Sequence, residues 1–91
     1  MYVEARLITL ILYDTKSLKD KRAIRQSLFK KIQNKYNVSI SEIDHLEDVK
    51  YLSIGISGVS NNLKFLNESL ESVILFIEES VNGDIIDIEK Y

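Results

Sequence analysis

The chain has 91 residues, 45% of them hydrophobic and 29% charged, with a formal net charge of −2, which is the composition of a globular domain. It has no cysteine and one histidine, which excludes a disulfide framework and disfavours zinc sites and Ser-His-Asp triads. The most apolar stretch, residues 7–12, is far shorter than the ~20 residues that cross a bilayer. We therefore expect a single domain over residues 1–91, with no membrane segment and no secretory signal.

A first strand is predicted over residues 2–13, which are rich in valine, leucine, isoleucine and tyrosine and contain no breaker. Beyond Arg6 both alternating sets of side chains are largely apolar. That pattern is typical of a central strand with both faces covered.

A first helix is predicted over residues 18–36. Ser17 can cap its N-terminus, with Asp20 at the third helical position, and Asn37 can end it in the left-handed conformation. At 100° per residue its apolar positions fall in one arc about 140° wide. These positions are Leu18, Ile24, Leu28, Phe29, Ile32 and Tyr36.

Two strands, residues 38–45 and 51–60, follow as a hairpin, and a change of phase near Glu42 indicates a bulge. A second helix is predicted over residues 62–80 and a last strand over residues 84–89. Leu75 lies outside the buried stripe of the second helix. The stripe itself consists of Leu63, Phe65, Leu66, Leu70, Val73, Ile74, Phe76 and Ile77.

This order of elements predicts an α+β, ferredoxin-like βαββαβ fold: a four-stranded antiparallel sheet with two helices on one face and the first and third strands central. The other face of the sheet has no layer of its own. An uncovered apolar patch is unusual on a monomer, so we expect a homodimer or higher homo-oligomer. The candidate contacts are the bare face, an edge strand and Leu75, in that order.

The charge is unevenly distributed along the chain. Residues 16–35 hold eight basic side chains and one acid, whereas residues 36–91 hold eleven acids and three bases. Such asymmetry is typical of a surface that meets a polyanion. The candidate nucleic-acid or anion-binding residues are Lys16, Ser17, Lys19, Arg22 and Lys30. The four cations are expected to form one exposed strip along the helix, and Ser17 adds a hydroxyl at the anion-receptive turn where the strip begins. The alternative is an ordinary capped helix with a solvated basic face.

Two further cations, Lys21 and Arg25, fall inside the apolar arc of the same helix. A buried cation needs a carboxylate or carbonyl partner, because an unpaired buried charge is too costly. Glu42 is the first candidate partner. The three residues are therefore expected to form a structural ion pair, with a ligand-binding role as the alternative.

No paired catalytic constellation is present, so we expect no catalytic residues and no cofactor. The arginine-bearing, glycine-rich loop of an acylphosphatase-like enzyme is missing after the first strand. His45 lies among the acids of residues 44–48, which is weak evidence for a metal, and an exposed turn is expected instead. The third strand offers Ser53, Gly55 and Ser57 to the open face and so lacks the stacking aromatics of direct RNA readout.

Three segments resemble a known bacterial family. Residues 17–22, Ser-Leu-Lys-Asp-Lys-Arg, are similar to the Ser-Leu-Lys-Glu-Lys-Arg signature of the YlxP-like family, domain of unknown function 503. Residues 37–45 resemble its second-strand segment and residues 59–61 its third-strand exit, with Ser41 in place of a common alanine. The resemblance implies a small ferredoxin-like protein of the bacterial cytoplasm with no established activity. Genes of this family commonly lie beside translation-initiation and ribosome-maturation genes, which points to a ribosome or RNA partner.

The leading hypothesis is a non-enzymatic binding protein that contacts ribosomal RNA or a ribosome-assembly partner through its basic first helix. The alternative hypothesis is a homo-oligomeric structural or regulatory protein-interaction module that binds no nucleic acid.

Overall fold

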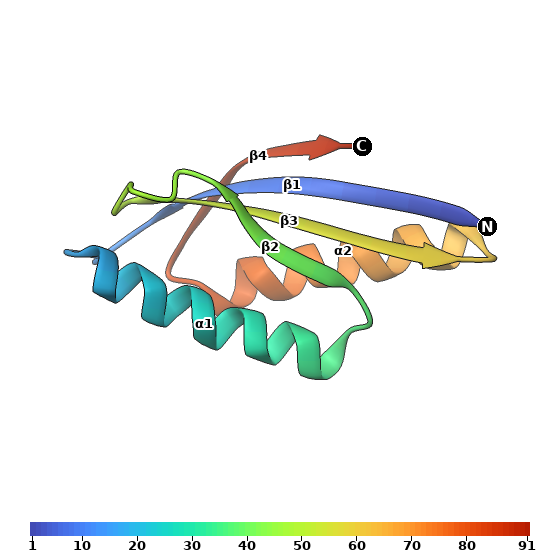
Figure 1. The fold of residues 1–91 in the computed structure, drawn as a ribbon, viewed down its shortest axis with the longest axis horizontal. Coiled ribbons are helices and arrows are strands. Elements are labelled where there is room, and N and C mark those ends of the chain that lie inside the picture. Colours follow the sequence, from blue (N-terminus) through green and yellow to red (C-terminus); the bar gives the residue numbers. More distant parts are fainter.

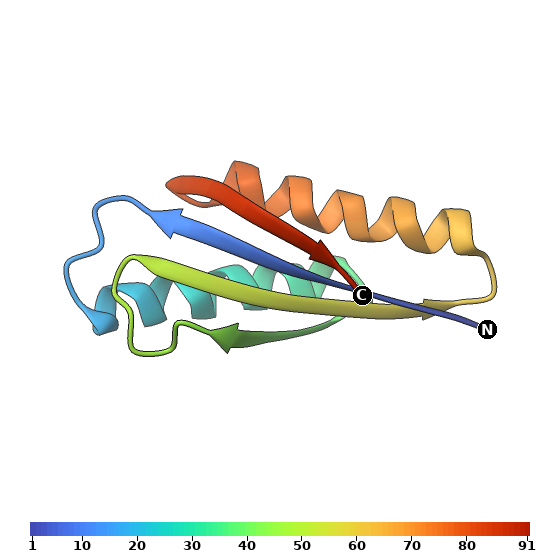
Figure 2. The same ribbon diagram turned by 90° about the horizontal axis from the view of Figure 1, so that it is seen from above.

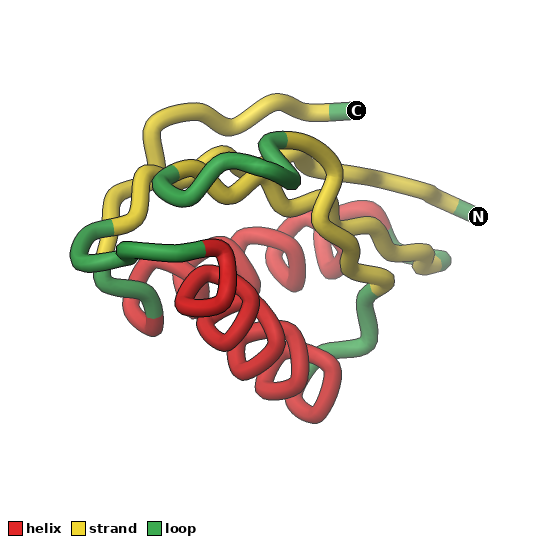
Figure 3. The backbone as a smooth tube through the Cα atoms, turned by 60° about the vertical axis from the view of Figure 1, so that its left-hand side comes forward, coloured by secondary structure: helices red, strands yellow, loops and turns green.

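Two helices pack as one layer against one face of a four-stranded sheet (Figures 1 and 3). The computed structural model describes residues 1–91. In chain order the elements are β1 (Tyr2–Leu12), α1 (Leu18–Lys35), β2 (Ser39–Asp44), β3 (Tyr51–Ser60), α2 (Leu63–Ser80) and β4 (Gly83–Lys90). All strand pairs are antiparallel and the strand order is β2-β3-β1-β4, so β1 and β3 are central. The predicted α+β ferredoxin-like fold is confirmed. Seen from above, α1 lies on the β2 side and α2 on the β4 side (Figure 2).

The hydrophobic core fills the space between the two layers. Alternate residues of β1 and β3 point toward the helices, since successive side chains of a strand face opposite ways. The thirteen buried apolar residues are Ile8, Leu10, Leu12, Leu28, Ile32, Leu52, Ile54, Ile56, Leu66, Leu70, Val73, Ile74 and Ile77. No helix of the chain is both long enough and apolar enough to cross a membrane.

Two details of the helix predictions are wrong, the end of the first helix and the start of the buried stripe of the second. α1 ends at Lys35, and Tyr36 caps it with an extended backbone and an N–H that donates to the carbonyl of Ile32. Asn37 is therefore not left-handed; only Asp14 and His45 among the non-glycine residues have positive φ. In the stripe predicted for α2, Leu63 and Phe65 are 41% and 62% exposed. Both belong to the first turn after the Asn62 cap, at the end of the core.

A bulge in β2 occurs where the change of phase predicted one. Glu42 is opposite Ile54 and Asp44 is opposite Ser53, so Ile43 is the extra residue of the bulge. The Ile43 side chain lies over Gly55, where an added Cβ would come within 2.6 Å of it. The bulge therefore turns an apolar side chain onto the face of the sheet that carries no helices.

Gly83, the first residue of β4, leaves no room for a side chain. An added Cβ would lie 2.2 Å from the carbonyl oxygen of Ile11, which belongs to the rigid backbone of β1. We predict that Gly83→Ala destabilises the protein by about 2 kcal/mol, as overpacking does. Gly58→Ala is the matched control, because its added Cβ would meet only the flexible end of Leu66, at 3.1 Å. Urea unfolding of both variants measures the difference, and equal losses would contradict the prediction.

Candidate functional site

The basic side chains of α1 divide into two sets by burial. Lys21 and Arg25 lie on the arc that faces the sheet, and Lys21 is 2% exposed. The other bases are exposed to solvent. Four of them are called the basic strip, namely Lys16 just before the helix and Lys19, Arg22 and Lys30 on it; Lys31 and Lys35 are exposed outside this strip.

The ammonium group of Lys21 is surrounded by two carbonyl acceptors and one carboxylate. Its Nζ donates to the carbonyl oxygens of His45 and of Asp48, the latter at 2.8 Å, and lies 3.1 Å from Oε2 of Glu42. The contact with Oε2 has the distance of an ion pair without the alignment of a hydrogen bond. Two hydrogen bonds and one opposite charge thus compensate the burial of the Lys21 ammonium group.

Glu42 joins both buried cations. Its Oε1 accepts a hydrogen bond of 2.7 Å from the guanidinium of Arg25, and its side chain is 6% exposed against 25% for Arg25. Burial by itself raises the pKa of Glu42, but the hydrogen bond from Arg25 and the positive charges of Lys21 and Arg25 outweigh it and hold the pKa below its usual value. The structure thus brings Lys21, Arg25 and Glu42 together, and we call them the ion-pair cluster. The cluster joins α1 to β2 and to the turn that follows it.

None of the four cations of the basic strip has a carboxylate partner. The three ion pairs of the chain are Arg6 with Glu4 and the two contacts of Glu42. Lys19 and Lys30 are eleven residues apart, which separates them by about 16 Å along the helix. The basic strip is therefore an unneutralised positive surface that extends over most of α1.

The turn before α1 is less open to an anion than its sequence indicates. The hydroxyl oxygen of Ser17 accepts from the backbone N–H of Asp20, and the Asp20 carboxylate accepts from the backbone N–H of Lys16. Thr15, whose hydroxyl lies in the same turn, is only 7% exposed. Ser17 serves as a helix cap, and a carboxylate already accepts at this end of the helix. The lysine and arginine side chains are thus the groups left to meet a polyanion.

Two buried or half-buried polar residues were not predicted. Arg6 is 3% exposed and donates to the carbonyl of Ala5 and to Oδ1 of Asn67 on α2. The sequence pattern that indicates its burial is its place in the same alternating set as Ile8. His45 is half-buried rather than in an exposed turn, because its Nδ1 lies 2.8 Å from the hydroxyl of Ser53.

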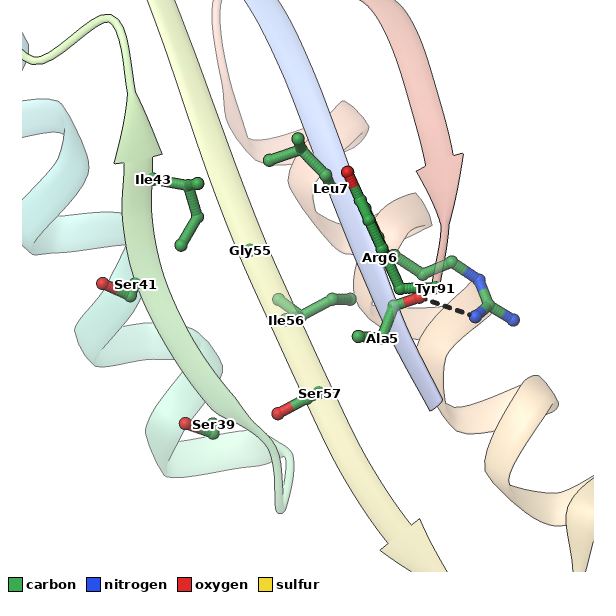
Figure 4. Close-up of a pocket in the computed structure, with 10 residues that line it drawn as sticks. All are labelled: Ala5, Arg6, Leu7, Ser39, Ser41, Ile43, Gly55, Ile56, Ser57 and Tyr91. Atoms are coloured by element: carbon green, nitrogen blue, oxygen red, sulfur yellow. Dashed lines mark hydrogen bonds between the residues drawn. The ribbon is translucent and has the colours of Figure 1, made fainter. Parts of the chain in front are cut away.

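The helix-free face of the sheet contains a hollow of about 340 Å³ (Figure 4). Its floor consists of small residues of β2 and β3, among them Ser41, Gly55 and Ser57. Ile43 borders it on one side, and Leu7 and Tyr91 border it on the other. The side chain of Arg6 points away from the hollow toward α2.

Comparison with known proteins agrees with the resemblance in three segments. Residues 3–90 match the family described as "Protein of unknown function (DUF503)". The chain belongs to the DUF503 family. It is 41% identical over 68 residues to the "Uncharacterized protein YlxP" of Bacillus subtilis (strain 168), an alignment that covers 75% of this chain and 74% of that protein. Membership of the YlxP-like DUF503 family is thereby confirmed.

The ion-pair cluster of this DUF503 protein predicts how three substitutions on α1 rank in the free energy of unfolding that they cost. We predict that Lys21→Met costs about 3 to 5 kcal/mol, because it leaves two carbonyls and part of Glu42 buried without a donor. Arg25→Met should cost about 2 kcal/mol, because Glu42 keeps Lys21 as its partner. Lys19→Met, an exposed substitution on the same helix, should stay within about 0.5 kcal/mol. Urea unfolding of the three variants measures the order, and an Arg25→Met loss equal to or above that of Lys21→Met would contradict it.

The lowered pKa of Glu42 makes its contribution dependent on pH. A carboxyl whose pKa is depressed by folding stabilises the native state fully above its unfolded pKa of about 4.3 and loses that effect as the pH falls through the folded pKa. We predict that the difference in unfolding free energy between the wild type and Glu42→Gln is constant near neutral pH and shrinks below about pH 4. Urea titrations at neutral and acid pH test this, and a difference that grows on acidification would rule it out.

Proposed function

We propose that this DUF503 protein is a non-enzymatic binding protein of the bacterial cytoplasm that contacts RNA through the basic strip of α1. Ribosomal RNA is the first target to test, because the genes of the family lie beside those of translation initiation and ribosome maturation. The observation that carries the proposal is the division of charge on α1. The cations that face the sheet have protein partners, whereas Lys16, Lys19, Arg22 and Lys30 have none.

Phosphate contacts require charge and reach rather than a rigid pocket, which suits long, exposed side chains on a helix. Binding displaces counterions that are condensed on the RNA, and this release supplies the free energy. The proposal assigns no reaction and no cofactor to the protein.

The exposed surface of α2 disfavours the approach of a polyanion from that side of the molecule. α2 exposes a row of carboxylates that have no cationic partner, namely Glu68, Glu71, Glu78 and Glu79. Because α1 and α2 lie on opposite sides of the helix layer, a polyanion is attracted to one flank of the molecule and repelled from the other (Figure 2). The two helices together therefore orient the encounter.

The uncovered sheet face supports a second candidate function, self-association as a homodimer or higher homo-oligomer. Val3, Ala5, Leu7 and Ile11 of β1 point to this face with no helix over them, and Val3 is 58% exposed. Contiguous apolar surface of this kind favours a protein partner. Two further candidate surfaces for self-association are the edge strands and Leu75, which is 55% exposed on α2.

RNA binding through the basic strip should weaken steeply with salt. With about four phosphates engaged, the slope of log affinity against log salt should lie roughly between −3 and −4. The double variant Lys19→Glu/Lys30→Glu should abolish binding, because both side chains face solvent and lie within the strip. Fluorescence anisotropy with a labelled ribosomal RNA fragment, between about 50 and 200 mM salt, provides the measurement.

The control carries the same change in net charge. Lys64→Glu/Lys90→Glu reverses two exposed lysines outside the strip and should leave most of the affinity intact. Equal losses in the two double variants, or no RNA association of the wild type at low salt, would overturn the proposal.

A further inference from the structure

We infer that two copies of this chain pack through their uncovered sheet faces about a two-fold axis parallel to the strands, so that β1 of each copy lies over β3 of the other. The inference rests on the proposed self-association and specifies its surface and geometry.

The face is large enough for a specific contact. β1, β2, β3 and β4 have 11, 6, 10 and 8 residues. At about 3.3 Å per residue and about 4.8 Å between strands, the sheet presents about 550 Å² per copy. Two copies would bury about 1,100 Å², just above the ~1,000 Å² that a biological interface requires. We therefore expect a dimer that dissociates at micromolar concentrations rather than a permanent one.

One row of residues across the open face is complementary to itself when reversed. The register of the strands places Ser41, Gly55, Leu7 and Glu89 side by side, in the sheet order from β2 to β4. A two-fold axis parallel to the strands places this row opposite the same row of the other copy in reversed order, so that β2 faces β4 and β3 faces β1. The Leu7 side chain of one copy then lies at the Gly55 position of the other, where it meets the apolar Ile43 side chain that covers this glycine. The hydroxyl of Ser41 likewise lies opposite the carboxylate of Glu89, whose Oε2 already accepts from Tyr91.

A hollow of about 340 Å³ lies beside this row, between Ile43 and Tyr91, and Ser39, Ser41 and Ser57 are among the residues that line it (Figure 4). Packed sheets interdigitate their side chains across a gap of about 10 Å, so large side chains need small ones opposite. On the open face β1 supplies the large side chains and β3 the small ones. The two-fold axis parallel to the strands places the large side chains of one copy opposite the small ones of the other. A partner's Leu7 would enter the hollow between Ile43 and Tyr91.

The alternative two-fold axis, perpendicular to the strands, is disfavoured on two grounds. It would stack β3 on β3, small residues on small residues, and leave the hollows unfilled. It would also stack β4 on β4. That arrangement would gather the open-face carboxylates of both copies, which are Asp84, Asp87 and Glu89.

The favoured axis has one repulsive row. Asp44, Ser53, Thr9 and Asp87 follow one another across the face, so Asp44 of one copy faces Asp87 of the other. No lysine or arginine of the four strands points to this face between them. Screening weakens this repulsion, so the dimer should tighten as salt rises. RNA binding through the basic strip has the opposite dependence on salt.

The experiment is sedimentation velocity over a series of micromolar protein concentrations, at low and moderate salt. The wild type should form a dimer that tightens with salt. Leu7→Asp should be monomeric, and Leu75→Asp is the matched control on α2 that should dimerise normally. Ser41→Lys should lower the dimer Kd about two- to five-fold and Ser41→Glu should raise it by a similar factor, as expected for exposed ion pairs with Glu89.

The outcomes separate the inference from the proposal on which it rests. A wild type that is monomeric throughout overturns both. A dimer that persists in Leu7→Asp would contradict the sheet face as the interface. A dimer lost in Leu75→Asp would assign self-association to α2 instead. Dissociation by Leu7→Asp without opposite effects of Ser41→Lys and Ser41→Glu overturns the axis. Circular dichroism checks folding, and the Ser41 variants, at an exposed position, test the interface even if Leu7→Asp fails to fold. RNA affinity of Leu7→Asp should be unchanged, since the basic strip lies on the helix layer.

Discussion

The buried ammonium group of Lys21 is the constraint on which the position of α1 depends. Its charge must meet acceptors and an opposite charge, because an unpaired charge in the interior costs several kcal/mol. The acceptors are two backbone carbonyls of the turn after β2, and the opposite charge is a carboxylate of β2 itself. These groups reach Nζ together only when α1 has one rotation about its axis and one height over the sheet. The cluster thus determines which residues of the helix face outward.

The outward surface of α1 is a consequence of that rotation. Glu42 pairs with both cations that face the sheet, whereas the cations that face solvent have no carboxylate partner. α2, on the other flank of the layer, exposes acids. A chain with a net charge of only −2 therefore has strongly different electrostatic surfaces on its two flanks. The sheet face follows a different principle, since size rather than charge alternates there, with leucine on β1 beside glycine on β3.

Much of the fold and part of the site could be predicted from local patterns. The 3.6-residue period of α1 placed Lys21 and Arg25 among apolar side chains, and the phase change near Glu42 indicated the bulge. The predictions that failed depended on non-local geometry. His45 was expected in an exposed turn, but its left-handed backbone turns its carbonyl toward Lys21 and its ring toward Ser53. The alternating set of Ile8 indicated the burial of Arg6, but no local pattern indicated its partner Asn67, which is 61 residues away.

The sequence by itself determined the order of the elements, the faces of the two helices and the arc on which each charge of α1 lies. These properties follow from periodicity and capping, which act over a few residues. Only the tertiary structure decided which groups surround Lys21, that Thr15 is buried, and where the hollow forms between Ile43 and Tyr91. Those features depend on the register of strands that are distant in the chain. Register follows from packing the whole core at once, because a shift of one residue would turn every side chain of a strand to the opposite face.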